Sequence, residues 1–199
     1  MNSLSRIRRS LAPLCIVAAF LSTSSVFAME IDGVNLDEKA NVAGQELRLN
    51  GAGIRHKFFF KVYVAALYLS EKKSEVPDIL AMPGARRVAI VMRREVGSEE
   101  FGKAFLSGLT QNTDQAERNR LSAQLQKFGD LFTSIPELKK GDALTIDWIP
   151  NSGTLVQING RKLADPFPDV GFYNALLKIW LGESPVDAKL KPLLLGEKS

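Results

Sequence analysis

Arg55 is the residue whose type and surroundings most clearly suggest chemistry, because it places a cation in a strand-like segment that runs from Asn50 to Leu69. A guanidinium at the rim of an apolar cavity is unfavourable unless an anion compensates its charge. Three interpretations follow from this position. Arg55 lies at the surface on an edge strand, forms an ion pair with a structural Asp or Glu, or binds an anionic ligand.

The segment around Arg55 alternates with a period of two, which is typical of a β-strand. Its even positions, which include Phe58 and Phe60, form a largely apolar face, whereas its odd positions are polar at the start and apolar at the end. This pattern predicts a central strand in a covered sheet, with its polar end at the mouth of a concave site. We expect Lys61 to add positive potential at that mouth, and Gly51 and Gly53 to form the sharp turn at which the strand begins.

The first 28 residues have the features of a cleavable secretory signal. Three arginines precede an apolar stretch that is too short to span a membrane, and small residues stand just before Met29. We expect cleavage after Ala28, a periplasmic location, and no integral membrane span in the mature protein. Loss of those arginines lowers the formal net charge from +4 to +1, and residues 29–199 have the size of a single domain.

Several classes of functional site are excluded by composition. The one cysteine, Cys15, lies in the predicted signal, and His56 is the one histidine. The mature chain therefore has no thiolate metal site, no histidine-rich metal centre and no Ser-His-Asp triad. It also lacks a glycine-rich phosphate loop and a basic-aromatic patch typical of nucleic-acid binding. We predict no cofactor, no metal and no nucleic-acid partner.

The rest of the chain alternates between strand and helix patterns in runs, which predicts an α+β fold with helices on one face of a mostly antiparallel sheet. The predicted strands are 31–36, 45–49, 87–93, 144–148, 155–158 and 161–164, with a polar loop at 37–44. The predicted helices are 74–82, one capped by Ser98, one at 113–132, one in the C-terminal third that stops at Gly182, and a short last one from Pro185 to Gly196.

Several motifs together resemble those of the chalcone isomerase-like proteins, in particular their bacterial exported branch. The motifs are NGAGIR, FKVYVAALYLS, PNSGT and WLGESPVDAKLKPLLLG, and the resemblance extends from Val34 to Gly196. It implies an open-faced β-sandwich in which a large antiparallel sheet is backed by a layer of helices, with a ligand cleft between the two.

The resemblance also implies roles for individual residues. Arg55 corresponds to the cleft arginine that follows a G-A-G-V motif in the plant enzymes. Tyr63 corresponds to a cleft threonine in the enzymes and to a tyrosine in the plastid fatty-acid-binding relatives. Phe101 and Gly108 stand where the isomerases have a tyrosine and an asparagine, so half of the enzymatic set is absent. Arg55, Tyr63, Phe101 and Lys61 are therefore the candidate ligand-binding residues, and no residue is assigned as catalytic.

Three functions remain open at this point. The first is a non-catalytic periplasmic protein that binds a fatty acid or similar amphipathic carboxylate, since an Arg and Tyr pair suits a carboxylate. The second is an isomerase, an intramolecular lyase of the chalcone isomerase type, acting on an unknown substrate. The third is an interaction or structural protein of the cell envelope whose cleft is filled by its own side chains.

Overall fold

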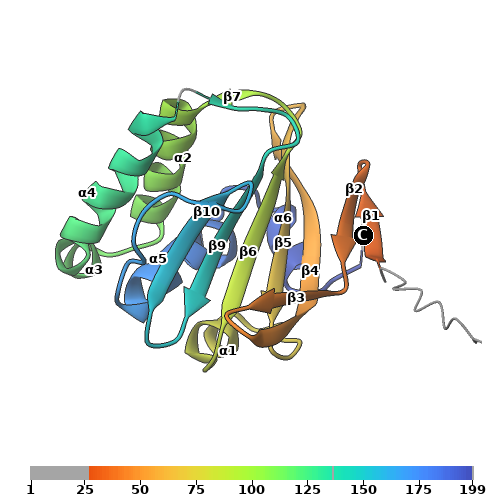
Figure 1. The fold of residues 1–199 in the computed structure, drawn as a ribbon, viewed down its shortest axis with the longest axis horizontal. Helices are drawn as coiled ribbons and strands as arrows, with labels where there is room; N and C mark the ends of the chain where they lie inside the picture. Colours follow the sequence, from red (N-terminus) through yellow and green to blue (C-terminus); the bar gives the residue numbers. More distant parts are fainter. Residues whose placement is uncertain (1–26, 136, 199) are drawn as a thin grey trace, which may run out of the picture.

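The computed structural model describes residues 27–135 and 137–198, and its main feature is a large antiparallel sheet with helices against one face (Figure 1). The sheet has seven strands in the order β11-β10-β9-β6-β5-β4-β3. Each neighbouring pair in it is antiparallel. The prediction of an α+β fold with a layer of helices on an antiparallel sheet is confirmed.

The strands of the large sheet are β3 (Lys39–Val42), β4 (Gln45–Lys57), β5 (Phe60–Leu69), β6 (Arg86–Met92), β9 (Ala143–Ile149), β10 (Gly153–Ile158) and β11 (Arg161–Lys162). Two small two-stranded sheets accompany it, formed by β1 (Phe27–Ile31) with β2 (Val34–Asp37) and by β7 (Val96–Gly97) with β8 (Glu137–Leu138). The hairpin of β1 and β2 lies beside the large sheet, at the right in Figure 1. The predicted signal segment, 1–28, lies outside the described residues except for its last two.

The helices are α1 (Val76–Ala81), α2 (Ser98–Gln111), α3 (Gln115–Arg120), α4 (Ser122–Leu131), the short 3-10 helix η1 (Phe132–Ser134), α5 (Val170–Leu181) and α6 (Leu190–Leu194). In Figure 1, α5 and α6 lie behind the sheet and α2 and α4 lie at its left. In the part of the chain that the structure describes, no helix is both long and apolar enough to cross a membrane.

The two faces of the large sheet bury separate apolar clusters. Alternate residues of β5 divide between them: Ala65 and Leu67 pack with the helices, whereas Val64 and Ala66 pack with residues of β2, β3 and β4. This division follows from the period of two along a strand. A strand buried on both faces is apolar throughout, which explains the continuous apolar run of β5.

The predicted single strand from Asn50 to Leu69 is wrong, because this segment turns back on itself at Phe58 and Phe59 and forms the β4–β5 hairpin. Phe58 and Phe60 therefore do not belong to a buried face: their exposed fractions are 88% and 47%. Twenty strand-like residues exceed the usual strand length of about five or six, so two strands should have been expected.

Gly51 and Gly53 lie inside β4 and do not form the turn predicted for them. A Cβ atom on Gly51 would lie 2.0 Å from the carbonyl oxygen of Leu193, and one on Gly53 would lie 2.6 Å from the Leu193 Cδ1 atom. These distances are below any van der Waals contact, so the glycines are needed because α6 packs directly on the backbone of β4.

Four helix and loop predictions need correction. The predicted helix at 113–132 is interrupted at Leu121, which separates α3 from α4. The predicted polar loop at 37–44 contains the strand β3. Gly97, and not Ser98, is the N-cap of α2, and the last helix begins at Leu190 instead of near Pro185.

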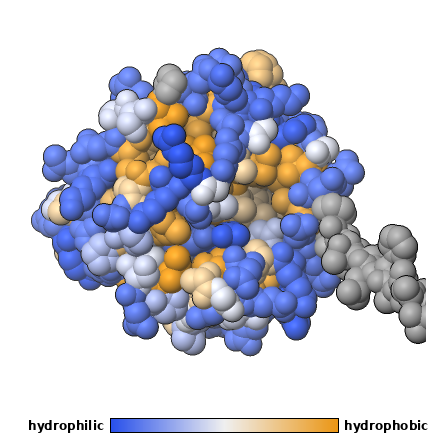
Figure 2. Space-filling model, in the orientation of Figure 1, coloured by the Kyte–Doolittle hydropathy of each residue, from blue (hydrophilic) through white to orange (hydrophobic). Residues whose placement is uncertain are grey.

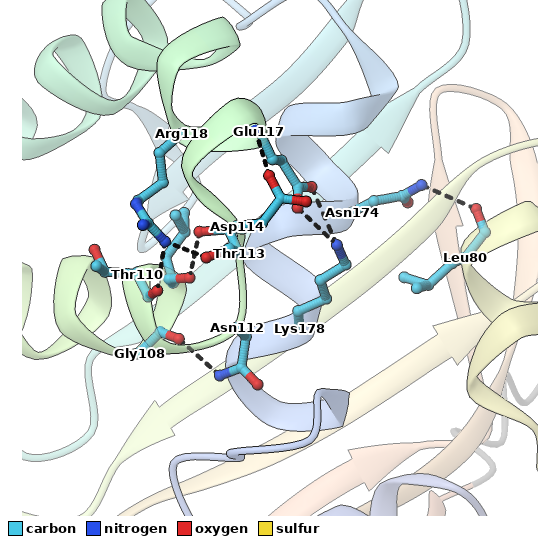
Figure 3. Close-up of polar contacts among 11 residues, drawn as sticks. Leu80, Gly108, Thr110, Asn112, Thr113, Asp114, Glu117, Arg118, Asn174 and Lys178 are labelled. Atoms are coloured by element: carbon cyan, nitrogen blue, oxygen red, sulfur yellow. Dashed lines mark hydrogen bonds and ion pairs between the residues drawn. The ribbon is translucent and has the colours of Figure 1, made fainter.

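Polar contacts fasten the residues after α2 to α5 and to the loop after α5, and Figure 3 shows those of Asn112 with Gly108 and of Glu117 with Lys178. Asn112 donates from Nδ2 to the carbonyl oxygens of Gly108 and Ser184, both at 2.8 Å, and accepts from the Ser184 amide at 2.9 Å. Glu117 of α3 pairs with Lys178 of α5 at 2.9 Å. These polar contacts lie at the C-terminal end of α2, whereas near its other end Phe101 packs against the rings of Tyr63 and Phe132.

Candidate functional site

Arg55 lies on β4 directly opposite Tyr63 of β5, near the end of the hairpin. Its side chain is partly buried, and its Nε atom is buried without a hydrogen-bond partner. Among residues 27–135 and 137–198, no Asp or Glu forms a salt bridge with it. An unpaired buried donor on a cation is costly, so this nitrogen is suited to a ligand oxygen.

The guanidinium of Arg55 packs over Tyr63, with its carbon 5.4 Å from the centre of the ring. Nearby, the carboxylate of Asp187 is already engaged by backbone amides, since Oδ2 accepts from His56 at 2.8 Å and Oδ1 accepts from Lys189 at 2.9 Å. The positive charge of Arg55 is thus held in place by an aromatic ring and not by an anion.

Tyr63 is almost completely buried, with 2% of its surface exposed. Its hydroxyl oxygen accepts a hydrogen bond of 3.0 Å from Nε1 of Trp180, and its own proton has no acceptor within the described segments. Burial raises the pKa of Tyr63 to about 12, although Arg55 and Trp180 act in the opposite direction. The hydroxyl is therefore a neutral donor near pH 7. In addition to Arg55 Nε, it offers a second hydrogen bond to an anionic oxygen.

Phe101 closes the site from the helix side. It is 3% exposed and meets the Tyr63 ring edge-on, with ring centres 6.3 Å apart. It also contacts Phe105 at 4.8 Å and so belongs to the aromatic core between helices and sheet. Because it has no hydroxyl, it contributes an apolar wall and no polar contact.

Arg55, Tyr63 and Phe101 line one common cavity, together with Ala104, Phe105, Ile179 and Val186. Its volume is only about 10 Å³, and an adjoining cavity of about 50 Å³ opens from Arg55 towards Arg94 and Glu100. By this measure a cavity of about 10–15 Å³ is enough for one water molecule. The two spaces can hold a carboxylate group, but a long apolar tail requires side chains to move apart.

Larger hollows lie elsewhere and do not include Arg55. One of about 460 Å³ lies between α4 and residues 164–168, and one of about 750 Å³ lies between β1 and the C-terminal residues. Neither is lined by an arginine beside a tyrosine. We base the candidate site on the polar groups at Arg55 and not on volume.

Lys61 does not line either of the cavities at Arg55. Its Nζ atom pairs with Asp32 Oδ1 at 2.6 Å, and the same carboxylate accepts from Arg93 Nε at 2.8 Å. The pKa of Asp32 is lowered by its hydrogen bonds from Lys61 and Arg93. The structure therefore brings together Arg55, Tyr63 and Phe101, and places Lys61 in an ion-pair cluster with the β1–β2 turn.

Two features of this region were not anticipated from the sequence. Trp180 is buried in the core, and it also positions the Tyr63 hydroxyl. Its place on an apolar helix stripe gave no sign of that hydrogen bond. The exposed run Phe58–Phe60 could have been recognised from the excess length of the predicted strand. Across the described ranges, no group of residues is arranged to hold a metal ion.

A family model for chalcone isomerase-like proteins matches residues 28–196. The chain belongs to the chalcone isomerase-like family. The crystal structure of a fatty-acid binding protein from Arabidopsis thaliana is similar to this fold, with a TM-score of 0.65 and 14% sequence identity, over 82% of this chain and 92% of that chain. A search of curated protein sequences found no match.

This family membership agrees with the resemblance seen in the motifs around Arg55 and near the C-terminus. The similarity to the Arabidopsis structure, at 14% identity, concerns the fold and does not carry a ligand across. The chemistry of the site must be argued from its own groups. Those groups are a guanidinium with a buried unpaired nitrogen, a neighbouring neutral tyrosine hydroxyl whose proton is available to donate, and apolar walls.

Proposed function

We propose that this chalcone isomerase-like protein binds an amphipathic carboxylate, such as a fatty acid, with its headgroup between Arg55 and Tyr63. The observation that carries the proposal is the buried, unpaired Nε atom of Arg55 beside a tyrosine hydroxyl whose proton has no acceptor in the described part of the chain. A carboxylate can accept from both donors at once, and charge-assisted contacts of this kind are the strong ones. The fatty-acid binding named for the Arabidopsis structure supports the same choice of ligand class.

A long tail must enter among the apolar walls of the site, which means that Phe101 and Val186 separate from the sheet. The N-terminal end of α2 is the part that can yield. Its polar tie to the hairpin is an exposed ion pair of 3.3 Å between Lys57 and Glu100, and such pairs contribute only about 0–1 kcal/mol. Its other contact with the hairpin is the apolar packing of Phe101 on Tyr63, which an apolar tail would replace. The C-terminal end is fastened by the Asn112 and Glu117 contacts. Ligand entry would therefore tilt α2 about its fastened end.

The proposal is tested by titrating the purified protein with saturated carboxylates of increasing chain length, after mass spectrometry has identified any lipid that co-purifies. We expect affinity to rise with chain length, and Arg55→Ala to lower it tenfold or more, since truncating one partner of a partly buried charged contact costs about 2–5 kcal/mol. Thermal stability of the empty Arg55→Ala protein should remain close to that of the wild type. Arg161→Ala, an exposed arginine on β11, is the matched control and should change neither property.

Arg55→Lys should recover part of the lost affinity, because an ammonium keeps the charge but lacks the planar fork of a guanidinium. If Arg55→Ala lowers the melting temperature steeply and leaves carboxylate affinity unchanged, Arg55 has a structural role and the proposed site fails.

The small cavity favours a second candidate, an envelope protein whose cleft is filled by its own side chains and which binds no small molecule. This candidate predicts no co-purifying lipid and no saturable binding at any chain length. It leaves the unpaired Nε atom of Arg55 without an explanation, and for that reason we place it second.

We also propose that the protein acts in the periplasm after loss of residues 1–28. A mature chain that begins at Met29 keeps the end of β1, from Met29 to Ile31, which pairs with β2. N-terminal sequencing of protein from the periplasmic fraction should begin at Met29, and a sequence that begins at Met1 would contradict export with cleavage.

A further inference from the structure

The tip of the β4–β5 hairpin presents three consecutive phenylalanines to solvent. Phe58, Phe59 and Phe60, which we call the aromatic tip, have exposed fractions of 88%, 82% and 47%. The hairpin ends at the top of the molecule in Figure 1, beside β7, and a hydrophobic group stands at the same edge in Figure 2. Elsewhere on that face the surface is mostly hydrophilic, with hydrophobic atoms in recesses.

Neither folding nor packing explains the residues of the aromatic tip. Phe58 is the first of the two turn residues and has a φ of 57°, a conformation for which glycine, asparagine or aspartate is favoured and a bulky residue is strained. Phe59 contacts Phe60, with ring centres 4.3 Å apart, but neither ring belongs to the buried clusters. A large exposed apolar group at a strained position indicates an interaction with something outside the chain.

Basic side chains surround the aromatic tip. Lys57 and Lys61 flank it in the sequence, and Arg94 lies over the Phe60 ring with its guanidinium carbon 4.9 Å from the ring centre. Glu100 and Asp32 neutralise the two lysines in part. Arg94 has no salt-bridge partner in the described ranges, so the tip keeps an excess of positive charge.

We infer that the aromatic tip inserts into the interface of a lipid bilayer that contains anionic lipid. The tip is a convex two-residue turn with three exposed rings, which suits a deformable medium, whereas a protein partner would need a socket shaped to receive them. Phenylalanines with neighbouring Lys and Arg side chains are the usual composition of interfacial membrane contacts, in which the basic groups meet anionic headgroups. This inference goes beyond the proposed function and does not rest on it.

The aromatic tip lies close to the cavity beside Arg55. Arg55, near the end of β4, lies three residues before the turn residue Phe58, and Lys57, Arg94 and Glu100 line the mouth of its cavity. A bilayer that received the aromatic tip would therefore face this mouth. The contact would place the candidate site at the surface from which an amphipathic molecule could enter.

The test is co-sedimentation of the purified protein with vesicles of phosphatidylglycerol and phosphatidylcholine in equal parts, compared with vesicles of phosphatidylcholine alone. We expect wild-type protein to bind the anionic vesicles, with affinity that falls as salt is raised. The double variant Phe58→Ser/Phe59→Ser should lose at least tenfold in affinity. Arg94→Gln should lose severalfold and should show a weaker dependence on salt.

Val170→Ser is the matched control, because Val170 is also an exposed apolar residue, with 41% of its surface exposed, but begins α5. It should bind vesicles as the wild type does. Arg55→Ala should also still bind vesicles, which separates failure of this inference from failure of the proposed carboxylate site. Phe59→Ser alone leaves the strained Phe58 position unchanged, so it should not alter the conformation of the hairpin. A partial loss of vesicle affinity in this variant would therefore exclude a conformational change as the cause of the loss in the double variant.

Three outcomes would overturn the inference. The first is no binding of wild-type protein to anionic vesicles. The second is equal binding by the double serine variant, or equal binding of the wild type to the phosphatidylcholine vesicles. The third is a concentration-dependent dimer in solution that the double variant abolishes, without any vesicle binding, because the tip would then contact a second copy of the chain.

Discussion

At the scale of single residues, two arginines show how differently a buried guanidinium can be accommodated. Arg86 is fully buried, and its Nη1 atom donates to the carbonyl oxygens of Ile79 and Leu80 and to Asn174 Oδ1 at 2.9, 3.2 and 3.0 Å. It therefore completes the C-terminal end of α1, where carbonyls lack partners within the helix. The Nε atom of Arg86 is buried without a partner, as is that of Arg55, but Arg86 has these three acceptors at Nη1. The guanidinium of Arg55 has no acceptor in the described segments, which is why we assign Arg55, and not Arg86, to a ligand.

The first prediction concerns the hydrogen bond between Trp180 and Tyr63. Tyr63→Phe leaves the buried Nε1–H of Trp180 without an acceptor and should reduce the free energy of unfolding by about 1–3 kcal/mol. In a Trp180→Phe background, the same substitution should cost about 1 kcal/mol less, because the donor has already been removed. Chemical denaturation of the four proteins of this double-mutant cycle measures the coupling.

Tyr68→Phe is the control for that cycle. Its hydroxyl donates to the carbonyl oxygen of Asp37 at 3.1 Å and has no contact with Trp180. The effects of Tyr68→Phe and Trp180→Phe should therefore add. Additive effects of Tyr63→Phe and Trp180→Phe would show that the hydrogen bond has no energetic role.

At the scale of elements, the hairpin of β4 and β5 determines where each candidate residue lies. Its register places Arg55 opposite Tyr63, and a shift between Arg55 and His56 leads into the turn. Such irregularities re-aim side chains near the end of a ladder. Arg55 and Tyr63 therefore face each other across the two strands, and the exposed turn lies between them in the sequence. A single continuous strand would have buried the phenylalanines of that turn.

The second prediction tests why β4 contains glycines. Gly53→Ala should destabilise the protein by about 1–3 kcal/mol, because its Cβ would overlap the Leu193 Cδ1 atom, so that this side chain must change rotamer or shift. Gly51→Ala should cost more, since the atom it meets is a backbone oxygen that cannot change rotamer. Thermal and urea unfolding provide the measurement.

Gly97→Ala is the matched control, because no atom lies within 4 Å of the added Cβ and its φ is –57°. Gly97→Ala should reduce the free energy of unfolding only by the cost of a poorer N-cap residue on α2, about 0.5–1 kcal/mol. If all three substitutions cost the same, close packing of α6 is not the reason for the glycines in β4.

At the scale of the whole molecule, helices cover one face of the sheet and β2 packs on part of the other, and the tyrosines are buried as a result. Burial raises the pKa of Tyr63 and of Tyr68 to about 12, and it raises the pKa of Tyr173 further. An unfolded tyrosine has a pKa of about 10. The neutral form of each ring is therefore favoured in the folded state.

The third prediction follows from the direction of these pKa shifts. A group whose pKa is raised by folding stabilises the protein fully below its unfolded pKa, and this contribution is lost as pH rises through the folded pKa. Stability should thus decline as pH rises from about 10 towards 12. Phenolate absorbance, followed together with circular dichroism, should appear only as the structure unfolds. Absorbance from one tyrosine near pH 10, with native circular dichroism, would contradict the burial described here.

Much of the architecture was predictable from sequence periodicity, because alternation along strands such as 144–148 and amphipathic spacing in helices such as α2 are local properties of the chain. The motifs around Arg55 indicated the family, and Arg55, Tyr63 and Phe101 do line one cavity. The turn at Phe58 and Phe59 was missed because these residues are poor turn formers, so no local signal separated the two strands.

Sequence by itself determined the α+β class, most of the elements and the identity of the polar residues in the site, since each depends on residue type and short-range order. Only the tertiary structure decided what surrounds them. Lys61 pairs with Asp32, and Trp180 reaches Tyr63 across 117 positions, by contacts between segments that the chain brings together only when folded. The closeness of α6 to β4, the small volume beside Arg55 and the exposure of the aromatic tip likewise depend on packing between distant segments, which no local pattern encodes.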